Sequence, residues 1–195
     1  MIKTTSILVN ELKNFKSPNQ KIRRMVEGGE LIPIIKGLYE TDRNTPAHLL
    51  APSIYGPSYL SFEFALAFHG LIPEAVYACT SATYGKRKLK RYKTPFGLFT
   101  YRDIPDEAYP YGVTALEENG YGFLLASPEK AVCDQLYKMP VAANQLEIGR
   151  LLFEDLRIDK REFNGLNKQD MIELSEKYHS TNLKRFADWL KRNGQ

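Results

Sequence analysis

The most concentrated group of functional side chains lies between residues 86 and 93, where six of eight residues are lysine or arginine. These cations are Lys86, Arg87, Lys88, Lys90, Arg91 and Lys93. At this density they can neutralise the phosphates of a nucleic acid, and a base can stack on the neighbouring ring of Tyr92. Alternation along a strand would divide the cations between two faces that cannot both be buried, so we expect an exposed edge strand or hairpin. Basic side chains also protect edge strands from aggregation, and the sequence leaves both interpretations open.

A second basic surface is predicted on a helix from Pro18 to about Glu27. Ile22, Met25 and Val26 recur at helical spacing and form its apolar face, which turns the polar side chains outward. The outward residues are Gln20, Arg23, Arg24 and Glu27, flanked by Asn19 and Lys21. Glutamine and arginine can make paired hydrogen bonds with base edges in the major groove, and lysine can contact phosphate. Charged side chains also cover the exposed faces of helices that bind nothing. The pattern alone therefore does not decide between a helix that reads DNA and one that is only solvated.

The elements around this helix are those of a winged helix-turn-helix. Thr5 can cap a preceding helix. Ser17-Pro18 can start the second helix, and Gly28-Gly29 would end it. Two short apolar runs then flank Lys36-Gly37 and predict a β-hairpin, with Lys36 at the tip, where a wing contacts the DNA backbone. We therefore expect a winged-helix DNA-binding domain over residues 1–45.

Residues 46–195 predict a second, mixed domain, which makes the fold class α+β. The stretch 41–53 is polar and contains prolines, and we expect the boundary between the two domains to lie within it. The expected elements are a helix over 62–68, a β-meander over 76–104, a strand over 122–126, a helix opened by Ser127-Pro128, and a helical part over 145–190 with breaks near 164–165 and 180–181. The sequence contains no repeat that would change this division.

Candidate catalytic groups are weak throughout the sequence. Ser127 and Lys130 have the spacing of a hydrolase pair, but a helix start accounts for Ser127 as the cap and for Pro128 in the first turn. Asp106 follows a proline, as in some nuclease metal sites, yet no Asp/Glu-x-Lys triplet follows it, so we expect Asp103, Asp106 and Glu107 to form a solvated turn. We predict that the protein is not an enzyme.

Metal and cofactor sites are not predicted either. The histidines, His48, His69 and His179, are scattered and lack the spacing of a zinc helix. Cys79 and Cys133 are expected to be small buried residues, because they form neither a disulfide framework nor a Cys-x-x-Cys motif. The few cysteines, and the lack of a signal peptide or a long apolar run, predict a cytoplasmic protein without membrane contact.

Composition permits nucleic-acid binding without requiring it. The 195 residues are 43% hydrophobic, which is enough for a packed core, and carry a formal net charge of only +4. Residues 1–50 hold eight lysines and arginines against five acidic residues, whereas residues 51–125 hold seven of each kind. The surplus therefore lies on the first quarter of the chain and in the segment 86–93.

Several ordered segments resemble the family of AbiEi-type antitoxins. The string Gly-Gly-Glu-Leu-Ile-Pro-Ile-Ile-Lys-Gly-Leu-Tyr at 28–39 is similar to the hairpin of their winged-helix domains. The segment Ile54-Tyr55-Gly56-Pro57-Ser58-Tyr59-Leu60-Ser61, together with Ala65-Leu66 and His69-Gly70-Leu71-Ile72-Pro73, resembles the most recognisable part of the family. Thr80-Ser81-Ala82-Thr83 and Ala126-Ser127-Pro128-Glu129-Lys130-Ala131 with Asp134 follow in the expected order. The resemblance covers most of residues 25 to 138, and beyond Leu146 the tail is similar only in being helical.

The resemblance implies a regulator of bacterial anti-phage defence. Such antitoxins counteract a nucleotidyltransferase-like toxin encoded beside them and repress the shared promoter, and in these type IV systems neutralisation does not require a stable complex. The implied partners are therefore DNA of the chain's own promoter and this toxin. The family's winged helix usually begins with an additional helix, whereas only about sixteen residues precede Ser17 here. The alternative is a protein-interaction module of a defence system that binds no DNA.

Overall fold

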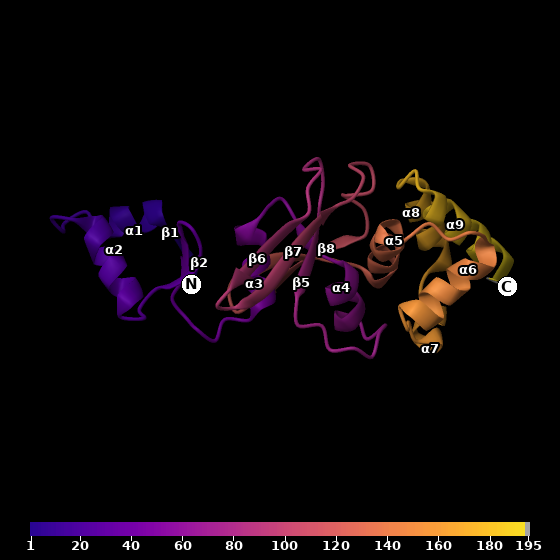
Figure 1. Cartoon of the computed structure of the whole chain (residues 1–195), viewed down its shortest axis with the longest axis horizontal. Coiled ribbons are helices and arrows are strands. Elements are labelled where there is room, and N and C mark those ends of the chain that lie inside the picture. The colour runs from indigo at the N-terminus through magenta and orange to yellow at the C-terminus, as the bar shows by residue number, and fades with distance from the viewer. Residues whose placement is uncertain (194–195) are drawn as a thin grey trace.

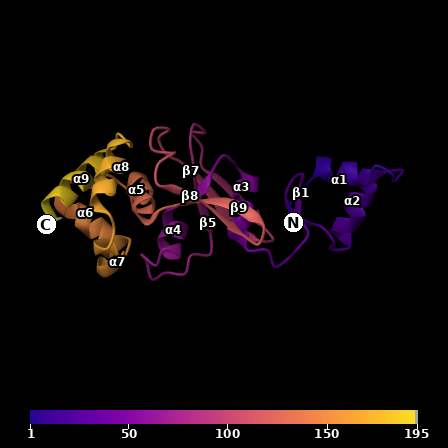
Figure 2. The same ribbon diagram turned by 180° about the vertical axis from the view of Figure 1, so that it is seen from behind.

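The computed structural model describes residues 1–193 and has an elongated shape (Figure 1). A small unit of two helices and short strands lies at one end, a larger sheet lies in the middle, and a group of helices forms the other end. The view from behind gives the same order (Figure 2). The expected α+β class is confirmed, because helices and two separate sheets make up the chain.

The N-terminal end contains the elements expected from the sequence and one additional strand. In order they are β1 (Lys3–Thr4), α1 (Thr5–Glu11), α2 (Pro18–Glu27), β2 (Ile32–Ile35) and β3 (Leu38–Glu40). The strands form an antiparallel sheet in the order β1-β3-β2. Thr4, rather than Thr5, caps α1 by accepting a hydrogen bond from the Ile7 amide. Leu8, Ile22 and Leu31 form a small separate core beneath the two helices.

The central sheet has six strands, and its order corrects the expected β-meander. Its strands are β4 (Tyr59–Leu60), β5 (Cys79–Thr83), β6 (Lys90–Thr94), β7 (Gly97–Asp103), β8 (Val113–Glu118) and β9 (Tyr121–Ala126), in the order β6-β7-β5-β4-β9-β8. β5 pairs in parallel with β7 and not with β6, which follows it in the chain. The more apolar β7 buries Phe99 and Tyr101 and takes the inner position, so the basic β6 is left at the edge.

Helices α3 (Ala47–Ile54) and α4 (Phe62–Phe68) pack against this sheet. Within the stretch where the domain boundary was expected, residues 47–53 belong to α3, whose Leu49, Leu50 and Ala51 are buried. Tyr101 of β7 donates a hydrogen bond to the carbonyl oxygen of Ala51 at 2.8 Å, which fixes α3 on one face of the sheet. The prolines of this stretch, Pro46 and Pro52, lie immediately before α3 and within its last turn.

The C-terminal end is helical, as expected. Its elements are α5 (Pro128–Lys138), α6 (Gln145–Arg150), the π-helical turn η1 (Leu151–Asp155), α7 (Lys160–Asn164), α8 (Lys168–Glu176) and α9 (Thr181–Asn193). The predicted breaks near 164–165 and 180–181 are confirmed, and Ser127 caps α5 through the Lys130 amide at 3.2 Å. Among the described residues no helix combines the length and apolar character needed to span a bilayer.

The small N-terminal sheet is joined to the rest of the molecule by apolar and polar contacts. Ile34 and Leu38 of the hairpin belong to the same core as the central sheet. Glu40, at the end of β3, is fully buried and accepts a hydrogen bond from the Tyr121 hydroxyl of β9 at 3.0 Å. Strand β2 also lies against β6. These contacts hold the hairpin beside the basic edge strand.

Candidate nucleic-acid interface

The polar face of α2 is exposed as the sequence predicted. Ile22 is buried and Met25 and Val26 are half-buried, whereas the side chains on the other side of the helix are open to solvent. The exposed residues are Asn19, Gln20, Arg23, Arg24 and Glu27, and Lys21 is half-buried. This pattern follows from the helical period, because the inward face is fixed by the small core beneath α1 and α2.

Two cations of this face have neighbours within the protein. The Arg23 Nε donates to Glu27 one turn later at 2.9 Å, and the Lys21 ammonium lies 5.9 Å from the centroid of the exposed Phe15 ring. No ion pair or side-chain hydrogen bond of Arg24 is found within residues 1–193. Arg24 and Gln20 are therefore exposed side chains of α2 that are available to an external partner.

Lys36 lies in the turn between β2 and β3 and is exposed. Its neighbour Gly37 has a φ of +82°, a conformation that glycine adopts without strain. The carbonyl oxygen of Gly37 accepts a hydrogen bond from the Thr5 amide at 2.9 Å, which ties the turn to the start of α1. The hairpin tip is thus held in place, with a cation facing solvent.

The basic segment 86–93 is divided between a loop and a strand. Only Lys90 to Lys93 lie in β6, so the expected alternation over the whole segment is wrong for Lys86, Arg87 and Lys88. The loop is held at its base, because the carboxylate of Asp103 accepts hydrogen bonds from the Arg87 amide and the Thr83 hydroxyl. Within β6, Arg91 and Lys93 are exposed and point to the same face of the sheet. The predicted exposed edge is confirmed.

Tyr92 does not have the role that the sequence suggested. Its ring is half-buried and packs between Tyr55, at 6.2 Å, and Tyr101, at 5.9 Å between ring centroids. Tyr55 also lies 5.6 Å beneath the ammonium of Lys86. The aromatic side chains of this region support the sheet and its basic loop, and Tyr92 does not offer a free face on which a base can stack.

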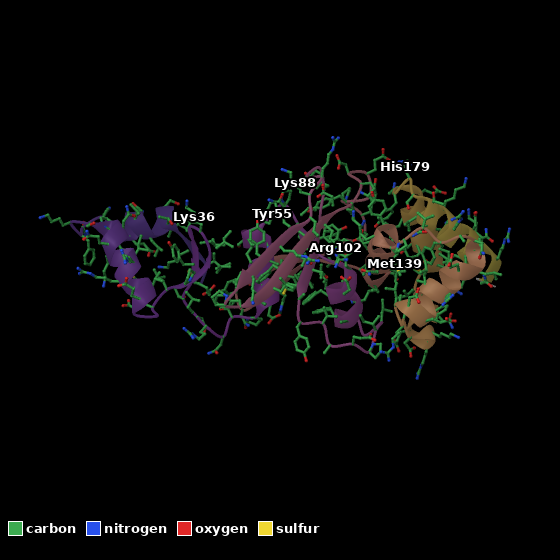
Figure 3. The ribbon with its side chains drawn as sticks, in the orientation of Figure 1. Lys36, Tyr55, Lys88, Arg102, Met139 and His179 are labelled. Carbon is green, nitrogen blue, oxygen red and sulfur yellow. The ribbon has the colours of Figure 1, made fainter. Side chains whose placement is uncertain are left out.

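The structure brings the hairpin and the basic segment together at one side of the molecule. In Figure 3, Lys36, Tyr55 and Lys88 follow one another along the upper side of the elongated shape. A small cavity of about 220 Å³ is lined by the last turn of α2, by β2 and by the turn Pro95-Phe96 that ends β6. The three basic elements are therefore neighbours, although each was predicted separately.

A buried polar network between the sheet and the C-terminal helices was missed at the sequence level. Lys130 and Asp134 of α5 are fully buried, and the Lys130 ammonium lies 3.3 Å from the Asp134 carboxylate. Asp134 also accepts hydrogen bonds from Tyr59 at 2.9 Å, from Ser61 at 2.6 Å and from Tyr178 at 2.6 Å. Lys130 donates to Tyr178 and to the Ala108 carbonyl oxygen, each at 2.7 Å. The sequence signal for this network was the pair of opposite charges, Lys130 and Asp134, four residues apart on a helix that also carries an apolar face.

The remaining candidate groups have local partners. His48 and His179 each contact a glutamate, and His69 contacts the Ala126 carbonyl oxygen. Cys79 and Cys133 are buried free thiols, as expected, and burial raises the pKa of each to about 12. Within residues 1–193 no three histidine, cysteine, aspartate or glutamate side chains are grouped so that they could hold a metal ion.

Comparison with models of known protein families gives no match, and comparison with curated proteins gives no significant match.

Proposed function

We propose that the protein is a DNA-binding antitoxin that represses its own promoter and counteracts a nucleotidyltransferase-like toxin. The observation that carries the DNA-binding part is the neighbourhood of α2, the β2–β3 hairpin and β6. Each presents exposed cations, which can neutralise phosphates along one duplex.

The order of elements at the N-terminus supports a winged-helix mode of binding. α2 follows α1, packs on it through Ile22, and is followed by the hairpin of an antiparallel sheet. In this mode α2 enters the major groove, where Gln20 and Arg24 contact base edges, and Lys36 contacts the backbone. Arg91 and Lys93 would extend the phosphate contacts beyond the N-terminal unit.

The antitoxin part of the proposal rests on the resemblance to the AbiEi family. The segments that carry this resemblance are far apart in the sequence, yet Tyr59, Ser61, Lys130 and Asp134 join in one buried network. Because these motifs meet in a single buried core, they support a fold shared with that family over residues 54–134.

The DNA-binding part is tested by titrating a labelled duplex from the region upstream of the chain's own reading frame. We expect this duplex to bind roughly 10³-fold more tightly than a scrambled duplex of equal composition at physiological salt. Equal affinities would exclude a promoter-specific repressor and would favour the interaction module without DNA reading.

The antitoxin part is tested separately by co-expression with the nucleotidyltransferase-like protein encoded beside the chain. Rescue of growth is expected with the wild type and also with Arg24→Ala, because the proposal assigns Arg24 to promoter reading alone. Growth arrest that persists with a well-expressed, folded wild-type chain would exclude the antitoxin role.

A further inference from the structure

The helical end of the molecule contains a groove whose lining combines cations with an exposed leucine. The groove has a volume of about 720 Å³ and lies between the start of α6 and one side of α9. Both helices are at the end of the molecule opposite to α2 (Figure 1). Its principal lining side chains are Leu146, Lys184, Arg185, Asp188 and Arg192. None of them belongs to the proposed DNA contacts.

The wall of this groove is fixed by hydrogen bonds from α9. Asn182 is buried, and its amide nitrogen donates to the carbonyl oxygens of Leu136 and Pro140, each at 3.0 Å. Its side-chain oxygen accepts from the Ala142 amide at 2.9 Å, and the Arg185 guanidinium donates to the Ala142 carbonyl oxygen. The segment between α5 and α6 is therefore held against α9, and the groove exists before anything binds.

The free charges of α9 alternate in sign along the groove. Lys184, Asp188 and Arg192 are four residues apart and so follow one side of the helix. Their side chains have no ion-pair or hydrogen-bond partner in the part of the chain that the structure describes. At ~1.5 Å rise per residue the two cations are about 12 Å apart along the axis, with the carboxylate between them.

One apolar side chain in the lining of the groove is uncovered, since Leu146 is 85% exposed. A nucleic acid would be attracted by Lys184 and Arg192, but Asp188 would repel its phosphates, and the exposed leucine would gain nothing from them. A protein helix can complement both the charges and Leu146.

We propose that this groove binds a helix of a partner protein that presents an acidic, a basic and an acidic residue at four-residue intervals. The two acidic residues pair with Lys184 and Arg192, and the basic residue pairs with Asp188. An apolar residue beside this stripe covers Leu146. The basic residue in the middle of the partner's stripe supplies specificity. A helix with three acidic residues would instead bring a negative charge next to Asp188, which would repel it.

The test uses two synthetic helical peptides of about 20 residues, a length at which isolated helices form. The first has Glu, Lys and Glu at positions i, i+4 and i+8 with leucines beside them, and the second has each of these charges inverted. In fluorescence anisotropy titrations with the full chain, we expect the first peptide to bind at least about tenfold more tightly, since three exposed pairs change from attraction to repulsion. Equal affinities would overturn the proposal.

A charge swap provides the decisive control. The triple variant Lys184→Glu, Asp188→Lys and Arg192→Glu should prefer the second peptide, whereas Arg161→Glu on α7 should leave the preference unchanged. A variant that is folded by circular dichroism and still prefers the first peptide would contradict the assignment of the groove. A loss of duplex DNA affinity in the triple variant would also contradict it, because the groove would then be a phosphate site.

Discussion

Lys130 and Asp134 lie one turn apart on α5, are both fully buried, and approach to 3.3 Å between ammonium and carboxylate. Their other hydrogen bonds reach Tyr59 and Ser61, at the short β4 strand, and Tyr178, after α8. The pair thus connects the middle strands of the sheet with the C-terminal helices. It is a structural centre of the larger part of the molecule.

Removal of one member of this pair is predicted to be severely destabilising. Asp134→Ala leaves the Lys130 ammonium buried without its counter-ion, which typically costs about 3–5 kcal/mol in the free energy of unfolding. Replacement of both residues, by Lys130→Met with Asp134→Leu, should cost less, because neither charge remains buried. Urea unfolding of the wild type and both variants gives the comparison. A double variant less stable than Asp134→Ala would show that the hydrogen bonds from Lys130 to Tyr178 and to the Ala108 carbonyl oxygen outweigh the cost of the uncompensated charge.

Arg24 is predicted to be a base-reading residue of α2. Arg24→Ala should weaken binding to the promoter duplex by about 1–3 kcal/mol without loss of helical content. Arg23→Ala should have a smaller effect, since Arg23 is already engaged with Glu27. Arg161→Ala, an exposed arginine on α7, serves as the control and should leave affinity unchanged. Unaltered binding by a folded Arg24→Ala variant would exclude α2 as the reading helix.

The basic segment is predicted to contact phosphates in addition to forming the sheet edge. Replacement of the exposed Lys88, Arg91 and Lys93 by glutamine should lower the slope of log affinity against log salt by roughly two to three units, with little change in sequence preference. Glutamine at three C-terminal lysines, Lys160, Lys168 and Lys191, removes the same charge and should leave the slope intact. If the slope is unchanged in a monodisperse sample of the first variant, these cations bind no DNA and only protect the sheet edge.

The attachment of the N-terminal sheet is predicted to weaken in acid. Burial alone would raise the pKa of Glu40, but hydrogen bonds from the N-terminal amine, the amides of Asp42 and Thr41, and Tyr121 hold its pKa below the ordinary value. A carboxyl whose pKa is lower in the folded state stabilises the fold above its unfolded pKa, and this contribution is lost as the pH falls through the folded pKa.

Glu40→Gln provides the measurement. The difference in unfolding free energy between wild type and this variant should be greatest near about pH 7 and should shrink towards about pH 3, as Glu40 itself becomes neutral. Asp106→Asn, an exposed carboxyl in the turn after β7, should show no comparable pH dependence. A difference that stays constant over the whole range would mean that Glu40 contributes no charge-dependent stability.

The two cysteines are predicted to be unreactive in the native protein. Cys79 and Cys133 are 3% and 0% exposed, and the pKa of each thiol is raised to about 12 by burial. Almost no thiolate is therefore present near about pH 8, where a disulfide reagent normally attacks. Titration with such a reagent should detect neither thiol in the folded chain and both in denaturant. Rapid modification of one thiol in buffer would indicate local opening of the core around it.

The sequence predicted the N-terminal elements well because their signals are local. Ser17-Pro18 begins α2, Gly28 ends it, and the turn at Lys36-Gly37 joins β2 to β3. Another local signal was overlooked: Asn119-Gly120, with φ values of +53° and +78°, forms the tight turn between β8 and β9. The strand β8 was missed because Leu116, Glu117 and Glu118 favour helix, and pairing with β9 overrides that preference.

The sequence by itself determined which side chains are exposed on α2 and that the segment around Lys90 lies at an edge, since helical period and charge density act over a few residues. Only the tertiary structure decided that β5 pairs with β7, that α3 is part of the core, and that Tyr92 is packed between two other tyrosines. It alone placed β2 beside β6 and enclosed Lys130 and Asp134. These outcomes depend on which distant segments bury their apolar side chains against one another. The free energy of the whole core decides that pairing, and no pattern of a few neighbouring residues contains it.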